Sequence, residues 1–327
     1  MVVINLKIFK SNRYNKEGKG IDKDAPEKHG FLKFWEIAWF KRYKLMGLNL
    51  LYFIPNLIAV ALASLSFMVS ISVFQALTGY EIQQGSDEAG LFMVLLCAVV
   101  LFFTVIPVFA VGPFQAGMTY ILRCFTKREP CFLWTEYIGK TRSNLKLSIK
   151  ASIINALAGF FIMLDFAVYM ALTSEHSKIV GLLPDWMLTI SFVVLIFLAS
   201  LFFIMCMYMY PMIVTFRLTL KQLYKNAMLF AFIRWLPNLG ILLLNAVLVF
   251  VPLFFVGQTW GLYVILVLYA ILGTAFIGFI NMSFTYPTIK KCMIDNYKAD
   301  KSRTENEYAT DNVSEDDSSE NSLPKGG

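Results

Sequence analysis

One stretch of the chain resembles a nucleotide-binding motif, namely Gly139, Lys140 and Thr141. A phosphate-binding loop follows the pattern G-x-x-x-x-G-K-[ST], in which both glycines let backbone N–H groups surround a phosphate. In this chain Trp134 occupies the position of the first glycine. The nucleotide hypothesis fails at that residue, and we predict no bound cofactor.

Asp165 is the one acidic or basic side chain inside the long apolar runs of the chain. A carboxylate is costly inside a bilayer, so such residues often mark proton, ion or substrate paths. Three interpretations stay open: a functional role, a structural hydrogen bond to a neighbouring helix, or a position near the membrane surface. Asn155, Asn245 and Asn281 lie in or beside the same apolar runs, where asparagines commonly bond between helices. We group the four residues as a candidate intramembrane polar site.

The sequence shows no pattern typical of a metal site, a catalytic site or a disulfide framework. His29 and His176 fall on opposite predicted sides of the membrane, so they do not predict a shared metal site. No nucleophile with a base, zinc motif or carboxylate pair stands out, and we predict no enzyme. The cysteines fall in apolar runs or on the predicted cytoplasmic side, where we expect reduced thiols. They are Cys97, Cys124, Cys131, Cys206 and Cys292.

Composition places these side chains in a membrane protein. Hydrophobic residues make up 57% of the 327 residues and charged residues 16%, and several apolar runs exceed the roughly 18 residues that cross a bilayer. We predict an all-α, polytopic membrane helix bundle with six transmembrane helices and cytoplasmic amphipathic helices. The net charge of +7 then reflects membrane orientation, and we predict no nucleic-acid binding. The spans are 47–72, 90–111, 151–172, 187–210, 237–256 and 260–284.

The distribution of positive charge predicts the orientation. Lys and Arg number 11 before the first span, none in the first loop, then 7, 1, 4, none, and 6 after the last span. Cytoplasmic segments carry an excess of these residues. Both termini and the even-numbered loops are therefore predicted to be cytoplasmic.

Three regions follow from these patterns. We predict a polar basic tail over 1–29, the transmembrane domain over 30–297 and an acidic disordered tail over 298–327. Between the first tail and the first span, Phe31, Trp35 and Trp39 gather on one side of a helix. This pattern is typical of a helix lying in the membrane interface.

The stretch around the failed nucleotide motif predicts an amphipathic helix. Trp134, Ile138, Leu145 and Ile149 fall on one side of a helix over about 132–150, and basic residues cluster on the opposite side. We predict that this single helix lies flat on the cytoplasmic surface and leads into the third span. Its candidate interfacial residues are Trp134, Ile138, Lys140, Arg142, Lys146 and Lys150.

Each even-numbered span runs to a proline that precedes a basic segment. Proline removes a helical hydrogen bond and allows a bend. In one such segment Arg217, Lys221 and Lys225 recur every four residues, which predicts a common helix face. The pattern fits either three copies of one hairpin or an ordinary span end, and both interpretations stay open. The predicted bends lie at Gly112, Pro113, Pro211 and Pro287.

Four segments together resemble the YesL-like family of bacterial integral membrane proteins. They are "LNLLYFIPN", "VGPFQAGMTYILRCFTKREPCFLWTEYIGKTRSNLKLSI", "YPMIVTFRLTLKQLYKNA" and "NMSFTYPTIKKCMID", and the likeness covers most of 30–297. The family's "TIGPA" appears here as "AVGPF". The resemblance implies a bacterial plasma membrane protein. Members are often encoded beside carbohydrate ABC-uptake genes, which implies an accessory role in uptake, and the family has no catalytic residues to carry over.

Two functions follow as hypotheses. In the first, the protein is an accessory or scaffold component whose basic helices bind anionic lipid and an ABC transporter permease or ATPase. In the second, the bundle itself is a small-solute transporter or channel that uses Asp165. The sequence indicates no oligomeric state.

Overall fold

A computed structural model describes residues 30–78, 111–173, 184–253 and 261–296. Within these ranges the chain forms helices and no strand, which confirms the all-α prediction for them. Both predicted tails and all but the last residue of the predicted second span, 90–111, lie outside the described residues.

Among the described residues, four helices are long and apolar enough to cross a membrane. They are α1 (Phe31–Thr78), α5 (Leu145–Thr173), α6 (Asp185–Thr215) and α8 (Trp235–Leu253). They coincide with the predicted first, third, fourth and fifth spans. Their length and composition are compatible with a multi-pass membrane protein.

Three shorter helices connect the long ones: α3 (Gly112–Thr126), α4 (Leu133–Ser143) and α7 (Leu220–Ile233). Their starts follow local chemistry. Pro113 stands in the first turn of α3, where its missing N–H has no intrahelical partner to lose. At the start of α7, the side chains of Thr219 and Gln222 form a capping box.

The last described segment is a helix interrupted by two π-helical turns. It consists of α9 (Gly261–Leu268), η3 (Tyr269–Gly273), α10 (Thr274–Ile289) and η4 (Lys290–Asp295). The predicted sixth span, 260–284, is therefore divided by η3. A π-turn places one extra residue in the helix and commonly accompanies a bend.

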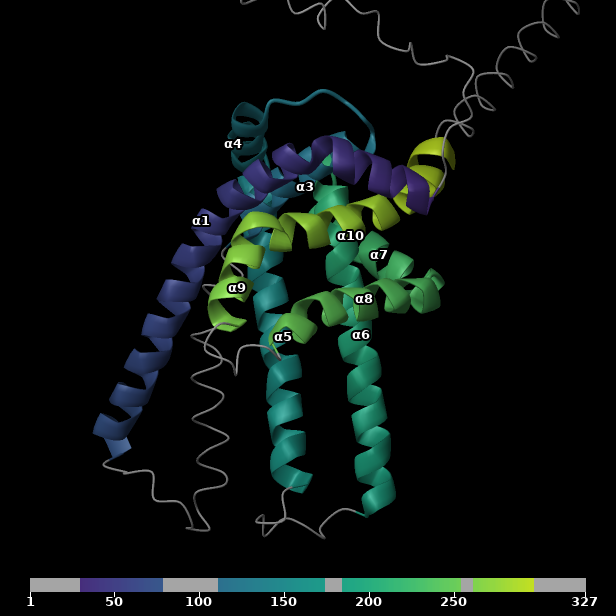
Figure 1. The fold of residues 1–327 in the computed structure, drawn as a ribbon. Coiled ribbons are helices and arrows are strands. Elements are labelled where there is room, and N and C mark those ends of the chain that lie inside the picture. Colours follow the sequence, from purple (N-terminus) through teal and green to yellow (C-terminus); the bar gives the residue numbers. More distant parts are fainter. Residues whose placement is uncertain (1–29, 79–110, 174–183, 254–260, 297–327) are drawn as a thin grey trace, which may run out of the picture.

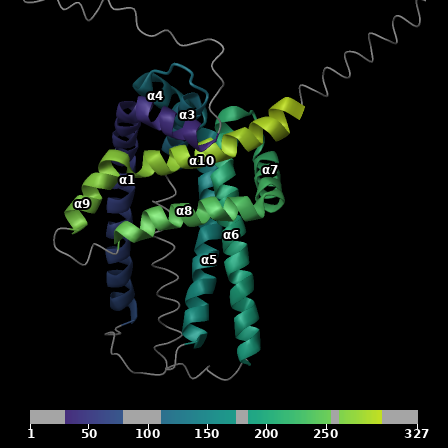
Figure 2. The same ribbon diagram turned by 45° about the vertical axis from the view of Figure 1, so that its right-hand side comes forward.

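The helices differ in direction. In Figure 1 the first part of α1 lies across one end of the molecule, and the rest runs away from that end in the same general direction as α5 and α6. We call this end, where α3, α4, α10 and the first part of α1 lie, the packed end. In both Figure 1 and Figure 2, α8 and α10 cross the direction of α5 and α6. The predicted fifth and sixth spans therefore do not run alongside the third and fourth.

Two predicted boundaries need correction. The predicted interfacial segment and first span form one helix, α1. The single amphipathic helix predicted over 132–150 is wrong, because α4 ends at Ser143 and α5 begins at Leu145. At the intervening Asn144 the backbone leaves the helical region, and its side chain donates to the Lys140 carbonyl at 2.9 Å.

The predicted proline bends and the predicted basic face of α7 also differ from the structure. Pro211 and Pro287 lie inside α6 and α10, which both continue beyond them, whereas Pro113 begins α3. Arg217 precedes α7, so it does not share a helix face with Lys221 and Lys225 as predicted.

The core lies at the packed end and consists of two buried clusters. One joins α1, α3 and α10 through residues such as Leu48, Phe125 and Phe279. The other packs α6 against α7 through residues such as Tyr208 and Phe230, whose rings stack 5.3 Å apart. Away from this end, α6 exposes apolar residues such as Ile190. Exposed apolar helices of this length are suited to contact with lipid.

Candidate functional site

The centre of the packed end is α3, which comes from the stretch that contains Gly112 and Pro113. It packs against α1, α4, α5, α6 and α10. Ala116, Ile121 and Phe125 on this helix are fully buried. The position of α3 therefore fixes the relative positions of the elements around it.

Two glycines let neighbouring helices approach α3 closely. A Cβ atom at Gly112 would collide with the Ser152 hydroxyl and lie 2.8 Å from that of Tyr210. A Cβ atom at Gly117 would collide with the Thr141 hydroxyl and lie 2.8 Å from the Tyr137 carbonyl. Gly112 thus has a packing role in addition to its position at the predicted bend, and Gly117 joins α3 to α4.

A buried polar cluster connects α5, α6 and α7. The hydroxyls of Ser152 and Tyr210 lie 3.1 Å apart. The Tyr224 hydroxyl donates to Asn155 Oδ1 at 2.8 Å, and Asn155 Nδ2 donates to the sulfur of Met209 at 3.5 Å. These bonds satisfy Asn155 between helices, an arrangement expected for a structural asparagine.

The other two asparagines of the candidate site lie elsewhere. Asn245 Nδ2 on α8 donates to Asn281 Oδ1 on α10 at 2.6 Å. Asn245 Oδ1 is buried and has no hydrogen-bond partner. This pair joins the two helices that cross α5 and α6.

Asp165 lies apart from all three asparagines. It is exposed on α5, near the exposed apolar residues Phe161 and Phe166. Ten residues separate it from Asn155, which corresponds to about 15 Å along a helix. Within the described ranges it makes no hydrogen bond or ion pair. The four predicted residues do not converge on one site.

Two buried asparagines that the sequence did not single out connect distant elements. Asn49 on α1 accepts from the Thr274 hydroxyl at 2.6 Å and from the Ala275 N–H at 2.8 Å. Its Nδ2 donates to the Tyr269 carbonyl at 2.7 Å, within the π-helical turn η3. Asn238 accepts from the Tyr208 hydroxyl at 2.8 Å. Their location within predicted spans is the sequence feature that could have identified them as asparagines that bond between helices.

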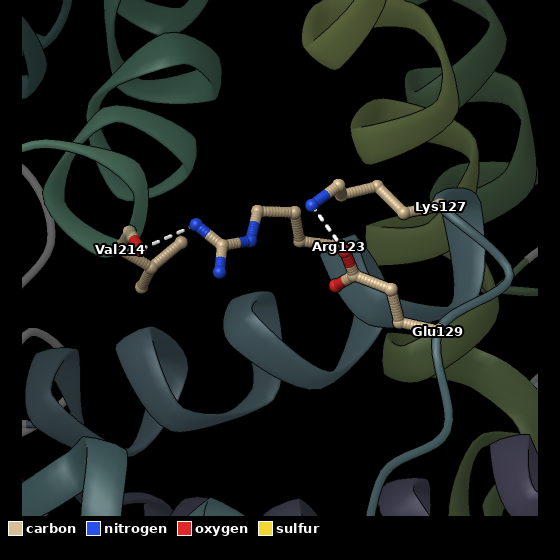
Figure 3. Close-up of polar contacts among 4 residues, drawn as sticks. All are labelled: Arg123, Lys127, Glu129 and Val214. Carbon is tan, nitrogen blue, oxygen red and sulfur yellow. Dashed lines mark hydrogen bonds and ion pairs between the residues drawn. The ribbon is translucent and has the colours of Figure 1, made fainter.

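Two arginine side chains donate hydrogen bonds near the ends of α6 and α10. Figure 3 shows Arg123 extending from α3 to Val214, whose carbonyl accepts from Nη1 at 2.8 Å, while Lys127 pairs with Glu129. Val214 lies in the last turn of α6, where carbonyls lack helical partners and a cation is favourable. Arg234, which directly follows α7, donates to the Thr288 hydroxyl near the end of α10.

The basic residues predicted on the cytoplasmic helix lie on a surface that α3 supports. Lys140 is half-buried, with its ammonium 4.5 Å from the ring centre of Tyr120. The remaining three cations are exposed, and we call them the basic surface: Arg142, Lys146 and Lys150.

The apolar residues of α4 divide between the protein and its surroundings. Trp134 is 64% exposed and Ile138 is half-buried, whereas Tyr137 and Thr141 are buried against α3. The predicted apolar face of α4 is therefore mostly free for contact with lipid. The buried face consists of different residues from those that the helical pattern indicated.

The chemistry available at the packed end is limited among the described residues. No three His, Cys, Asp or Glu side chains gather there to hold a metal ion. Burial raises the pKa of the Cys124 and Cys131 thiols, and protonated thiols are poor nucleophiles. No family model, curated protein or solved structure matches the chain.

Proposed function

We propose that this protein is an accessory or scaffold component of the bacterial plasma membrane that assists carbohydrate uptake by an ABC-type transporter. The observation that carries the proposal is the basic surface formed by Arg142, Lys146 and Lys150. Arg142 is exposed on α4, which approaches α3 at Gly117, and Lys146 and Lys150 are exposed on α5, which approaches α3 at Gly112. A rigid, charged surface can bind a partner at low entropic cost. The resemblance to the YesL-like family supports the link to ABC uptake.

The proposal includes an orientation in the membrane. Six crossings with both termini in the cytoplasm would place the basic surface on the cytoplasmic side, where a transporter ATPase and anionic lipid are found. The charge alternation of the loops supports this orientation. The fifth and sixth of these crossings are proposed from hydrophobic run length and loop charge alone, because α8 and α10 cross the direction of α5 and α6 in the structure.

The transport hypothesis has less support. A coupling carboxylate is expected to face a bundle interior or a polar path. Asp165 is exposed, and Asn155, ten residues away along α5, belongs to a separate buried cluster. We therefore favour the accessory function.

Co-purification tests the two functions against each other. Affinity capture of the full chain from native membranes is expected to enrich an ABC-type permease or its ATPase. Solute flux into liposomes that contain the pure protein alone, lost in Asp165→Asn, would instead support transport.

A further inference from the structure

A cavity of about 500 Å³ opens at the packed end, between three segments that are distant in sequence. Gly30 and Lys33 line it from the start of α1, Lys127 and Arg128 from the end of α3, and Lys290 from the start of η4. Its described lining contains no His, Cys, Asp or Glu and no residue of the proposed basic surface. It is therefore a separate site.

The cavity wall is positively charged. Lys33, Lys127, Arg128 and Lys290 line it, and none of the described lining residues is a carboxylate. Glu36 lies outside the lining and pairs with Arg128 at 3.3 Å, and Glu129, also outside it, pairs with Lys127. Lys290 and Arg128 are exposed, so a ligand can reach both side chains. Lys290 makes no ion pair within the described residues, whereas an anion at Arg128 would share the guanidinium with Glu36. Converging cations of this kind favour an anion.

Neutral hydrogen-bond donors complete the wall. Ser283 and Tyr286 line the cavity from α10, and Tyr286 is only 9% exposed. Neither side chain has a hydrogen-bond partner within the described part of the chain. Hydroxyl donors beside lysines and an arginine suit the oxygens of a phosphate group.

The backbone around the cavity is also unusual. Arg128 has φ of 59°, in the left-handed region that a side chain rarely adopts. Such conformations often occur at ligand sites. The start of α1 adds N–H groups with no acidic residue in the first turn.

Apolar side chains lie immediately beside the charged ones. Phe31 is 72% exposed and Leu32 is 65% exposed, and both stand between the lining residues Gly30 and Lys33. Trp35, one turn further along α1, is 49% exposed. A charged cavity next to exposed aromatic and aliphatic groups fits a molecule with an anionic head and an apolar chain.

We propose that this cavity binds the phosphate of an anionic membrane phospholipid. Lys127, Arg128 and Lys290 hold the phosphate oxygens, Ser283 and Tyr286 donate hydrogen bonds, and the acyl chains lie along Phe31 and Leu32. Free phosphate shares the chemistry of the head but not of the chains. The inference is independent of the proposed accessory function. It concerns lipid binding by the purified protein, and the cavity shares no residue with the basic surface.

Calorimetric titration of the full chain in an uncharged detergent tests the proposal. The probes are dioctanoyl phosphatidylglycerol, dioctanoylglycerol and inorganic phosphate. We expect binding of the phosphatidylglycerol, no saturable binding of dioctanoylglycerol, and weakening by about tenfold or more in Lys127→Gln/Lys290→Gln. Arg128→Gly is a second variant, because glycine accepts the left-handed backbone while the guanidinium is lost. It is expected to keep its thermal midpoint and to bind more weakly.

Lys221→Gln/Lys225→Gln is the matched control, since it removes two exposed cations from α7. It should leave the affinity unchanged. Equal weakening in the control and the cavity variant would overturn the site, as would a full chain that binds neither phosphate probe. Inorganic phosphate binding as tightly as the lipid, with the same sensitivity to the variants, would support the phosphate site and overturn the lipid as its source.

Discussion

Single residues at the packed end act mainly through close contacts with residues that are distant in the sequence. Gly112 was predicted as a bend because Pro113 follows it, and the structure adds a contact with Ser152 and Tyr210. The need for Gly117 could not be predicted, because it depends on the position of Thr141 on another helix. The exposure of Asp165 could not be predicted either. The sequence shows a carboxylate in an apolar run, but it does not show which helices surround that carboxylate.

Gly117→Ala is expected to destabilise the protein by about 1–3 kcal/mol, because the added methyl group would collide with α4. Gly139→Ala is the matched control on α4, where a Cβ atom meets nothing within 4 Å. The control should be neutral or stabilising by up to about 1 kcal/mol, since alanine favours a helix. Thermal unfolding in detergent measures both, and equal midpoints for the two variants would contradict the close contact.

Cysteine reactivity is expected to follow burial. Cys131 is buried with a raised pKa, whereas Cys292 is exposed. Alkylation needs the thiolate, so in single-cysteine versions of the protein at pH 8 Cys131 should react at least about tenfold more slowly than Cys292. Denaturation should remove the difference. Comparable rates in the native protein would argue against the buried position of Cys131.

At the scale of elements, hydrophobic run length predicted six spans, and four of them coincide with long apolar helices in the described part of the chain. The break at Asn144 and the π-turn η3 were not predicted from the sequence. Hydrophobic periodicity reports helix faces and run lengths, and neither feature changes them. In η3, the side chain of Asn49 reaches Tyr269 from a helix 220 positions earlier in the chain. The directions of α8 and α10 likewise depend on packing, and span length alone could not predict them.

Asn49→Ala should weaken the connection between α1 and the segment from η3 to α10. The variant loses bonds to Tyr269, Thr274 and Ala275, and we expect a cost of about 2–3 kcal/mol at roughly 1 kcal/mol for each bond.

Asn56→Ala is the control, because Asn56 donates to the Tyr52 carbonyl of its own helix at 2.8 Å. This change should alter the free energy of unfolding by less than about 1 kcal/mol. Both values come from unfolding in detergent with tryptophan fluorescence. A control as destabilised as Asn49→Ala would refute a special role for Asn49.

At the scale of the whole molecule, a packed end with a buried core is combined with apolar helices that are mostly exposed. Only 22% of the most apolar window of α5, and 6% of that of α8, is buried inside the protein. Burying such surface in lipid is favourable. The described residues thus form a packed end and helices whose exposed apolar surfaces are suited to a bilayer.

Topology reporters test the proposed orientation. A reporter inserted at Asp87 is expected outside the cytoplasm, and one at Gln258 likewise, because the segments around them carry no Lys or Arg. A cytoplasmic Gln258 with an external Asp87 would show that α8 lies within the membrane without crossing it. A cytoplasmic Asp87 would overturn the orientation of the whole chain.

Quantitative affinity capture from native membranes tests the accessory function most directly. The full chain is compared with Arg142→Glu/Lys146→Glu/Lys150→Glu, which reverses the basic surface, and with Lys221→Glu/Lys225→Glu, which reverses two charges on α7. Lys140 is left in place because it contacts Tyr120. We predict that an ABC-type permease or its ATPase is enriched with the full chain and the α7 variant, and lost with the basic-surface variant. Absence of such a component from the full-chain capture, or its equal recovery with all three proteins, would contradict the account.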